Sequence, residues 1–496
     1  MTVATDTTKA RARFDPRAFE RFRFTSRELG ADGTAILRYA LDEAIAFEER
    51  FALPLAAAGR ERGARELSAG ERERVDGLLA LAHWVAGVSY FKTALPPAVA
   101  CETGAPPPAT AALLEALYSE GLGELAYSNG LRSLPRPRFP RAGAAVALGA
   151  VPAAPKAAPA APPASAVSPA FAAPPSPPSS APALGRVLVP VGGGKDSAVA
   201  LELVRRSGCE TALFSIGQAR PIARTAAAAG LPWLRAGRTL DPALAALNEA
   251  GAVNGHVPVT AIVCCAALLT AALNGFDAVA MANERSASVG NVRFDGVEVN
   301  HQFSKGLRVE RLLSAALAEL APAGPRAFSV LRPASELAIA RAFARMERYH
   351  GAFTSCNAIF RLDPELRASS WCCECPKCRF VYLALAPFSE PQRLARIFGR
   401  DLLDEEEQFE GFALLTATGG HKPFECVGEE QESVAALRLL AADARWSGHR
   451  VVRRAAAEVL PRFAPGEGDP ASVLALGGEH DLPEELMAEV RAVLGA

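Results

Sequence analysis

A glycine turn that joins an apolar run to a helix-like segment constrains this chain more than any other feature. Residues 186–191 are apolar and rich in valine, which predicts a buried strand, and residues 198–206 follow a helical pattern. The turn between them comprises Gly192, Gly193, Gly194, Lys195, Asp196 and Ser197. Glycines let backbone N–H groups approach an anion, and a helix N-terminus adds its positive dipole end. We therefore predict a phosphate site here.

The surrounding pattern predicts the class of fold. The glycine spacing is neither GxxxxGK[ST] nor GxGxxG, so the two commonest phosphate loops are excluded. Further strands are expected at 210–216 and 277–281, and a long apolar helix is expected at 258–273. Strands that alternate with helices indicate an α/β fold, a doubly wound parallel sheet with helices on both faces.

Two polar segments lie where strands of this sheet should end. Residues 254–258 precede the long helix, and residues 282–286, which include Asn283 and Glu284, follow the strand at 277–281. Ligands of open α/β sheets bind beyond the carboxyl ends of the strands, so Asn283 and Glu284 are candidate cofactor-binding residues. Ordinary polar loops remain an alternative.

A proline-rich stretch divides the chain. Residues 151–184 contain eleven prolines in 34 positions and almost no charge, which predicts an extended linker. We expect an N-terminal α+β domain at 14–142 that binds substrate, and a linker at 143–184. The nucleotide domain with a cysteine cluster follows at 185–445, and a helical tail at 446–496.

Within the N-terminal domain we expect three local structures. Residues 74–91 are apolar on most sides and predict a buried helix. A second helix is expected from an N-cap at Thr110 to residue 120. The segment 121–131 is rich in glycine and asparagine and is predicted to be a loop.

Composition bounds the partners. The 496 residues carry a net charge of -1, which provides no general field for nucleic acid, so a nucleic-acid partner is not expected. The N-terminus lacks a signal-peptide pattern, and no run of eighteen uncharged apolar residues occurs. We expect a cytoplasmic protein without a membrane segment.

The ten cysteines are too sparse for a disulfide scaffold, but four lie within residues 372–378. Cys372, Cys375 and Cys378 have CxxCxxC spacing, and Cys356 lies sixteen residues upstream of the first. Four such thiolates can bind one tetrahedral Zn²⁺, so we favour a structural zinc site. A [4Fe-4S] cluster, a redox pair and simple buried thiols remain open.

The turn resembles the SGGxDS signature of the PP-loop ATP pyrophosphatases, with Gly192 in place of the first serine. The resemblance implies a PP-loop fold of the adenine nucleotide alpha hydrolase type and cleavage of ATP to AMP and pyrophosphate. It also implies that Gly193, Gly194, Asp196 and Ser197 hold the β and γ phosphates together with Mg²⁺.

Seven segments, one of which contains the turn, occur over both domains: GVSYFK (87–92), GLGELAYSNGL (121–131), VPVGGGKDSAVALE (189–202), NGHVPVTAI (254–262), VNHQFSKG (299–306), WCCECPKCRFVY (371–382) and GGHKPFECVGE (419–429). Together they resemble the MurL family of epimerases, which act on UDP-N-acetylmuramoyl-L-alanyl-L-glutamate in bacterial wall synthesis. The resemblance implies an AMP-forming isomerase whose partners are ATP and the UDP-muramoyl dipeptide.

The implied reaction needs acid and base groups. An acyl adenylate of the terminal carboxylate makes the α-proton acidic, and the proton must leave one face and return on the other. Cys426, Glu425 and His301 are the candidate catalytic residues beside Asp196, with Cys356 a further candidate if it binds no metal. A lone cysteine is often only a buried apolar group, which stays the alternative for Cys426.

Two basic features allow contacts with substrate. His301 and Lys305 could contact adenylate or phosphate, although a solvated loop is equally consistent with them. The run 132–141 carries four arginines and could contact the UDP diphosphate, but a solvated connector fits it better.

Two other functions remain open at this level. One is a PP-loop enzyme that amidates or thiolates a nucleobase or tRNA, because 7-cyano-7-deazaguanine synthases carry a similar cysteine array. The other is a non-catalytic regulator that binds nucleotide and uses a zinc ribbon for partner contact.

Overall fold

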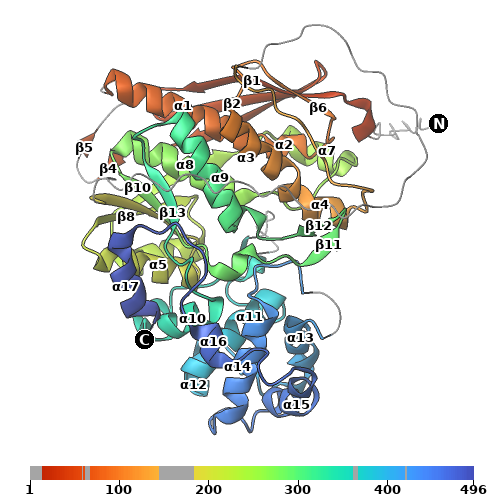
Figure 1. Cartoon of the computed structure of the whole chain (residues 1–496), viewed down its shortest axis with the longest axis vertical. Coiled ribbons are helices and arrows are strands. Elements are labelled where there is room, and N and C mark those ends of the chain that lie inside the picture. The colour runs from red at the N-terminus through yellow and green to blue at the C-terminus, as the bar shows by residue number, and fades with distance from the viewer. Residues whose placement is uncertain are drawn as a thin grey trace, which may run out of the picture.

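The computed structural model describes residues 14–57, 60–61, 67–143, 184–360, 367–418 and 422–495. Its centre is a nine-stranded sheet in the order β13-β10-β7-β8-β9-β3-β2-β1-β6 (Figure 1). The strands are β1 (Arg21–Leu29), β2 (Thr34–Leu41), β3 (Ile45–Ala52), β6 (Ala98–Cys101), β7 (Arg186–Pro190), β8 (Glu210–Ile216), β9 (Trp233–Thr239), β10 (Ala278–Met281) and β13 (Arg326–Ser329).

The five strands from β13 to β9 form a parallel α/β sheet. Successive residues of β7 enter different cores: Val187 and Val189 pack with the cluster that contains α5 (Lys195–Arg206) and α10 (Glu336–Ala344), and Leu188 packs on the other face. That other face is covered by α8 (Val259–Asn274), with α9 (Leu307–Leu320) beside it. The predicted doubly wound arrangement is confirmed, because β8 and β10 lie on opposite sides of β7.

The N-terminal strands continue the same sheet. β1, β2 and β3 form an antiparallel meander, and β3 pairs with β9 so that Phe51 lies opposite Arg238. The helix α1 (Ala69–Ala86) packs on β1 and against α8, and one hydrophobic core contains residues of both regions. The region that the sequence separates by a linker is therefore continuous with the α/β sheet. The expected linker lies almost wholly outside the described residues.

Three local expectations for this region need correction. The segment 121–131 is largely helical, with 3-10 turn Glu120–Leu122 followed by α4 (Gly123–Ser128). Its glycines serve close packing, since a Cβ on Gly123 would lie 3.3 Å from Val299. The helix predicted at 74–91 is two helices, α1 and α2 (Val88–Phe91), separated at Gly87. A Cβ on Gly87 would lie 2.6 Å from the ring of Phe24.

Thr110 does not cap the second helix. The helix α3 (Pro108–Tyr118) begins three residues earlier than predicted, with Pro107 at the N-cap. The backbone N–H groups of Ala109 and Thr110 donate to the Glu319 carboxylate on α9, both at 2.9 Å. A carboxylate from another helix therefore satisfies the free N–H groups, which a local pattern could not reveal.

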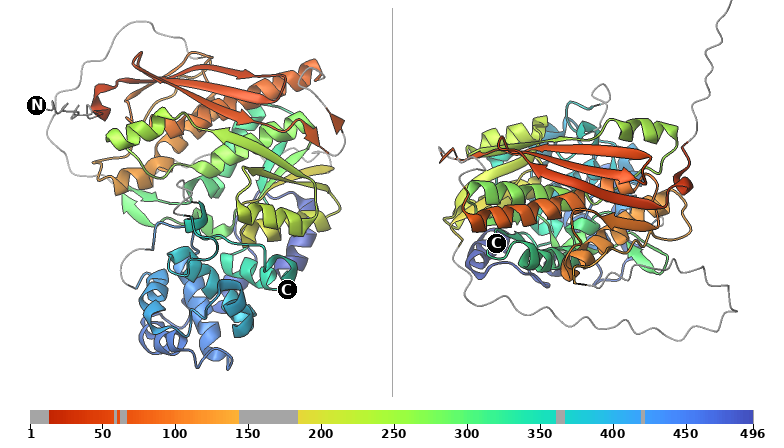
Figure 2. Two further views of the ribbon diagram at one scale, coloured as in Figure 1. Left: turned by 180° about the vertical axis from the view of Figure 1, so that it is seen from behind. Right: turned by 90° about the horizontal axis from the view of Figure 1, so that it is seen from above.

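The C-terminal part is helical and lies at the opposite end of the molecule from β1–β3 (Figures 1 and 2). Its helices are α11 (Pro376–Leu385), α12 (Pro391–Phe398), α13 (Phe409–Ala413), α14 (Glu430–Ala442), α15 (Arg450–Glu458), α16 (Pro470–Leu474) and α17 (Glu484–Leu494). The last of them, α17, returns to pack on α5 and α10. Among the residues described above, no helix is both long and apolar enough to cross a bilayer.

Candidate active site

The glycine turn lies at the point where the sheet reverses its winding. β8 lies on one side of β7 and β10 on the other, so the turn after β7 occupies the topological switch point at which α/β proteins bind ligands. α5 begins after Gly194, which provides no side-chain cap. Gly193 has φ +84°, and a Cβ there would lie 2.6 Å from Pro221. The turn thus presents bare backbone and a helix N-terminus, as the sequence predicts for a phosphate site.

Lys195 does not extend from the turn. Its side chain is 2% exposed, and its ammonium group pairs with Asp196 and with Glu336 on α10. Burial raises the pKa of Asp196, but Lys195, Lys377 and Lys305 lower it overall, so the carboxylate is ionised. The Ser197 hydroxyl donates to the Gly194 carbonyl at 3.0 Å. Lys195 therefore anchors the turn through its two carboxylate partners.

The second predicted loop directly follows β10. Asn283 donates through Nδ2 to the Ser329 hydroxyl at 3.0 Å. Glu284 is 1% exposed, and its Oε1 accepts no hydrogen bond from the part of the chain that is described. A buried carboxylate oxygen without a donor is costly, so Glu284 is suited to a cation or a hydroxyl group of a ligand.

A buried arginine holds this loop next to a lysine-bearing one. The Arg332 guanidinium donates to the Glu284 carbonyl at 2.7 Å, to the Lys305 carbonyl at 2.6 Å and to the Glu310 carboxylate at 2.8 Å. Burial lowers the pKa of Lys305, but the nearby anions Cys426, Glu284 and Asp196 raise it overall. Lys305 is thus a fixed positive charge between the phosphate turn and Cys426.

Cys426 lies in a strongly positive environment. Burial raises the pKa of its thiol. The charge of Lys305, the hydrogen bond to His301 and the charge of Lys377 outweigh this effect and lower the pKa to about 6. Lys377 also donates from its ammonium group to the Cys426 carbonyl. The thiol is therefore ionised at neutral pH and can accept a proton.

His301 bonds to Cys426 and to a carboxylate that the sequence pattern did not identify. Its Nδ1 lies 2.5 Å from Oε2 of Glu124, which α4 supplies. Burial lowers the pKa of His301, but the bonds to Cys426 and Glu124 raise it to about 9. The neighbouring His256 ring lies 4.4 Å away between centroids, and its pKa is lowered to about 4 by burial and by His301. A thiolate, an imidazolium and a carboxylate therefore form one chain of contacts.

Glu425 has a different environment from its neighbour. Burial raises the pKa of its carboxyl group. The carboxylate accepts a hydrogen bond from the Lys377 backbone N–H at 3.0 Å. It is thus engaged in holding α11, and the structure favours Cys426 and His301 over Glu425 as acid and base groups.

Most of the arginines at 132–141 have partners. Arg136 pairs with Asp295 at 2.7 Å, and Arg138 and Arg141 pair with Glu115 at 3.4 and 3.1 Å. These pairs favour the connector interpretation over a contact with the UDP diphosphate.

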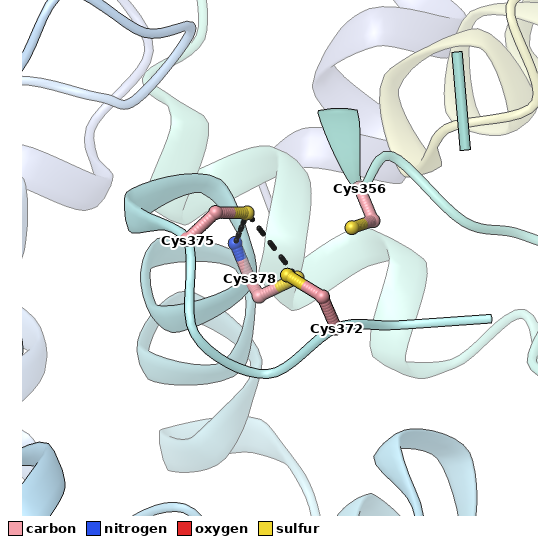
Figure 3. A group of neighbouring side chains, drawn as sticks. All are labelled: Cys356, Cys372, Cys375 and Cys378. Atoms are coloured by element: carbon pink, nitrogen blue, oxygen red, sulfur yellow. Dashed lines mark hydrogen bonds between the residues drawn. The ribbon is translucent and has the colours of Figure 1, made fainter. Parts of the chain in front are cut away.

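The four predicted metal ligands converge (Figure 3). The sulfur atoms of Cys356, Cys372, Cys375 and Cys378 all lie within 4.8 Å of one another, and those of Cys372 and Cys375 lie 3.6 and 3.5 Å from that of Cys378. A tetrahedral zinc ion with Zn–S bonds of about 2.3 Å separates its sulfurs by about 3.8 Å. Cys373, with φ +61°, turns away, and its Sγ lies 3.3 Å from the Phe398 carbonyl. The donor set fits a structural zinc ion.

Sequence reasoning missed Glu124, Glu336 and Lys377. Glu124 lies inside the segment 121–131, which carries the family resemblance but offers no chemical motif. Glu336 begins α10, and Lys377 lies between two cysteines. Their roles depend on contacts between distant segments, so no spacing rule identifies them.

Comparisons with known proteins cover almost the whole chain. A family model described as the MurL N-terminal domain matches residues 13–330, and one described as the MurL C-terminal domain matches residues 352–468. A Xanthomonas oryzae pv. oryzae protein named UDP-N-acetyl-alpha-D-muramoyl-L-alanyl-L-glutamate epimerase is 40% identical over 483 residues, 97% of this chain and 98% of that protein.

Two proteins of the same name come from other bacteria. That of a Micromonospora strain is 42% identical over 94% of this chain and 97% of its own length. That of Salinispora tropica is 43% identical over 82% of each chain. No solved structure matches this chain.

Proposed function

Because the chain belongs to the MurL family, we propose that it converts the terminal L-glutamate of UDP-N-acetylmuramoyl-L-alanyl-L-glutamate to D-glutamate, in peptidoglycan precursor synthesis. The relatives make the chain an enzyme of the epimerase type. Their names favour neither a nucleobase-modifying activity nor a non-catalytic role. One observation carries the chemical proposal: Lys305 and Lys377 lie near both the glycine turn and the Cys426 thiol, and they lower the pKa values of Asp196 and Cys426.

The first step of the proposed reaction is activation of the terminal α-carboxylate. A carboxylate already carries negative charge, so the neighbouring C–H bond is a very weak acid. Attack of the carboxylate oxygen on the α-phosphorus of ATP forms an acyl adenylate and releases pyrophosphate. This step removes the opposing charge and makes the carbonyl electron-poor.

The glycine turn is suited to the departing diphosphate in a PP-loop fold. The backbone amides of 192–194 precede the N-terminus of α5, which has no side-chain cap, and Lys305 and Lys377 add positive charge near Asp196. The Glu284 carboxylate, with its unpaired oxygen, and Asp196 would hold Mg²⁺. The ion supplies further neutralisation of phosphate charge.

The second step is proton transfer at the α-carbon. The Cys426 thiolate takes the α-proton, and the electron pair of the broken C–H bond delocalises onto the activated carbonyl. The His301 imidazolium, oriented by Glu124, returns a proton to the opposite face. The bound α-carbon separates the two groups, and their hydrogen bond re-forms after release and restores the starting protonation. Water then cleaves the mixed anhydride to AMP and the D-glutamyl product.

The four thiols are proposed to hold a structural zinc ion. The spacing of the sulfurs and the lack of an open position among four protein ligands are typical of closed structural sites. No step of the reaction uses this ion.

The proposal is tested with the purified protein, ATP, Mg²⁺ and the UDP-muramoyl-L-Ala-L-Glu nucleotide. We expect AMP and pyrophosphate, together with D-glutamate after acid hydrolysis and chiral chromatography. The nucleotide that carries L-Ala alone serves as the control and should give neither product. Formation of ADP and orthophosphate, or AMP formation with no D-glutamate, would contradict the proposed reaction.

A further inference from the structure

One arm of the four-cysteine centre reaches the phosphate turn. Cys356 is fully buried, and two residues earlier the Thr354 backbone N–H donates to the Gly193 carbonyl at 2.9 Å. The intervening Ser355 lies against the turn, since a Cβ on Gly194 would be 3.5 Å from that of Ser355. Two residues span at most about 7 Å, so a fixed Cys356 restricts where Thr354 can lie.

The other arm reaches the thiol loop. Cys375 caps α11, where its sulfur accepts the Cys378 backbone N–H at 3.4 Å. Lys377 lies between these two cysteines, and its backbone N–H donates to Glu425 at 3.0 Å while its ammonium group donates to the Cys426 carbonyl. The first turn of α11 therefore fixes the backbone that carries Cys426.

The two arms converge at the sulfurs, and nearby the ring of Phe353 contacts that of Trp371 at 5.2 Å between centroids. Cys356 and α11 come from different segments, and Figure 3 shows their thiols directed toward a common centre. A cation bound by the four thiols would join the segment that contacts Gly193 to the helix that contacts Cys426.

We propose that zinc at Cys356, Cys372, Cys375 and Cys378 braces the active site, holding the phosphate turn and the Cys426 loop in register although it contacts no substrate. The proposal rests on the proposed function for the identity of the two ligand-binding parts. The proposal means that residues 191–197 and 422–429 keep their positions only when the metal is bound.

The test compares zinc-loaded protein with the Cys372→Ser variant and with wild type treated with a chelator and then reloaded with zinc. Metal analysis should give one zinc per chain in the loaded protein. We expect hydrogen exchange in peptides covering 191–197 and 422–429 to accelerate at least tenfold without zinc, with no change in β1–β3. ATP affinity, measured by calorimetry, should fall at least tenfold, and both effects should reverse on reloading.

Cys373→Ser is the matched control, since this neighbour is buried but directed to Phe398. It should retain zinc, exchange protection and ATP affinity. Unchanged exchange and ATP affinity after zinc removal would overturn the brace, as would acceleration throughout the chain including β1–β3. A loaded protein that shows the local zinc dependence but forms no D-glutamate would refute the proposed reaction and leave the brace standing. If Cys372→Ser does not fold, the chelated wild type decides the question.

Discussion

At the scale of single residues, two neighbouring groups with displaced pKa values define the chemistry. The pKa of Cys426 is lowered to about 6 and that of His301 is raised to about 9, so a thiolate and an imidazolium coexist between these values. Their contact makes the two titrations properties of the pair. Environments that displace two pKa values in opposite directions identify a base and an acid.

This pair predicts a bell-shaped pH profile. The thiolate is required, so kcat/KM for epimerisation should rise as pH passes about 6, and the imidazolium is required, so it should fall as pH passes about 9. Solvent deuterium incorporation at the glutamyl α-carbon should follow the same profile. Cys426→Ser should abolish that incorporation, and undiminished exchange in this variant would remove the thiol from the mechanism.

Glu124 should act as a positioning residue through His301. Glu124→Gln removes the negative charge that helps to raise the pKa of His301, so the alkaline limb of the pH profile should move to lower pH. We expect kcat to fall by about 10- to 100-fold. AMP formation should persist, because the proposed diphosphate contacts come from residues 192–197 and not from α4. Glu120→Gln, on the preceding turn and paired with Arg308, is the control and should leave the profile unchanged. An unmoved alkaline limb in Glu124→Gln would show that the carboxylate has only a structural role.

The sequence allowed part of this site to be predicted. Cys426 and His301 were named because their residue types suit proton transfer, and the structure brings them together. Lys195 was assigned to the phosphates from its place in the turn, but its pairing with Glu336 depends on α10, 141 residues away. Glu124 carries no motif and is recognised only from its contact with His301.

At the scale of elements, the strand, turn and helix at 186–206 followed from local pattern. A strand buried on both faces reads as a continuous apolar run, and a glycine turn before a helix has a clear signature. The helical residues 120–128 were missed because glycines normally indicate a loop, whereas here Gly121 and Gly123 pack closely against Pro258 and Val299. The same residue type therefore serves conformation in one element and packing in another.

Two glycines of the turn after β7 provide a test, because only one of them has a positive φ and a close neighbour. Gly193→Ala places a Cβ 2.6 Å from Pro221 at φ +84°, which should cost about 1–3 kcal/mol and displace the amides that we propose bind diphosphate. We expect a lower Tm in calorimetry and at least tenfold weaker ATP binding. Gly192→Ala meets open space within 4 Å and should keep the Tm of the wild type. Equal Tm values for the two variants would contradict the packing argument.

At the scale of the whole molecule, the site is assembled from three regions of the chain. α4 supplies Glu124, the region 184–330 supplies the glycine turn after β7 and the loop that carries His301, and the C-terminal part supplies Cys426. The linker predicted two separate units, but their strands belong to one sheet. This could not be predicted because the pairing of β3 with β9 has no signature in the local sequence of either strand. The MurL N-terminal model accordingly matches residues 13–330, across the linker.

A buried ion pair spans this union and predicts how the protein unfolds. Arg238 on β9 donates to the fully buried Glu49 on β3 at 2.5 Å and to the Ser89 hydroxyl at 3.0 Å. Arg238→Ala leaves a buried carboxylate without its partner, which should destabilise the protein by about 3–5 kcal/mol. Because β3 and β9 belong to one sheet and one core, calorimetry should show a single transition shifted to lower temperature.

The surface pair on the same strand supplies the comparison. Arg50 pairs with Glu48 at 2.6 Å, and the two side chains are 53% and 31% exposed, so Arg50→Ala should cost less than about 1 kcal/mol. If Arg238→Ala instead produced an early transition confined to β1–β3, with the α/β strands still protected from hydrogen exchange, the N-terminal region would be an independent unit. Cooperative loss of both regions means that Glu124 and the phosphate turn are held by one folded body, so that the acid-base chain and the nucleotide site form or fail together.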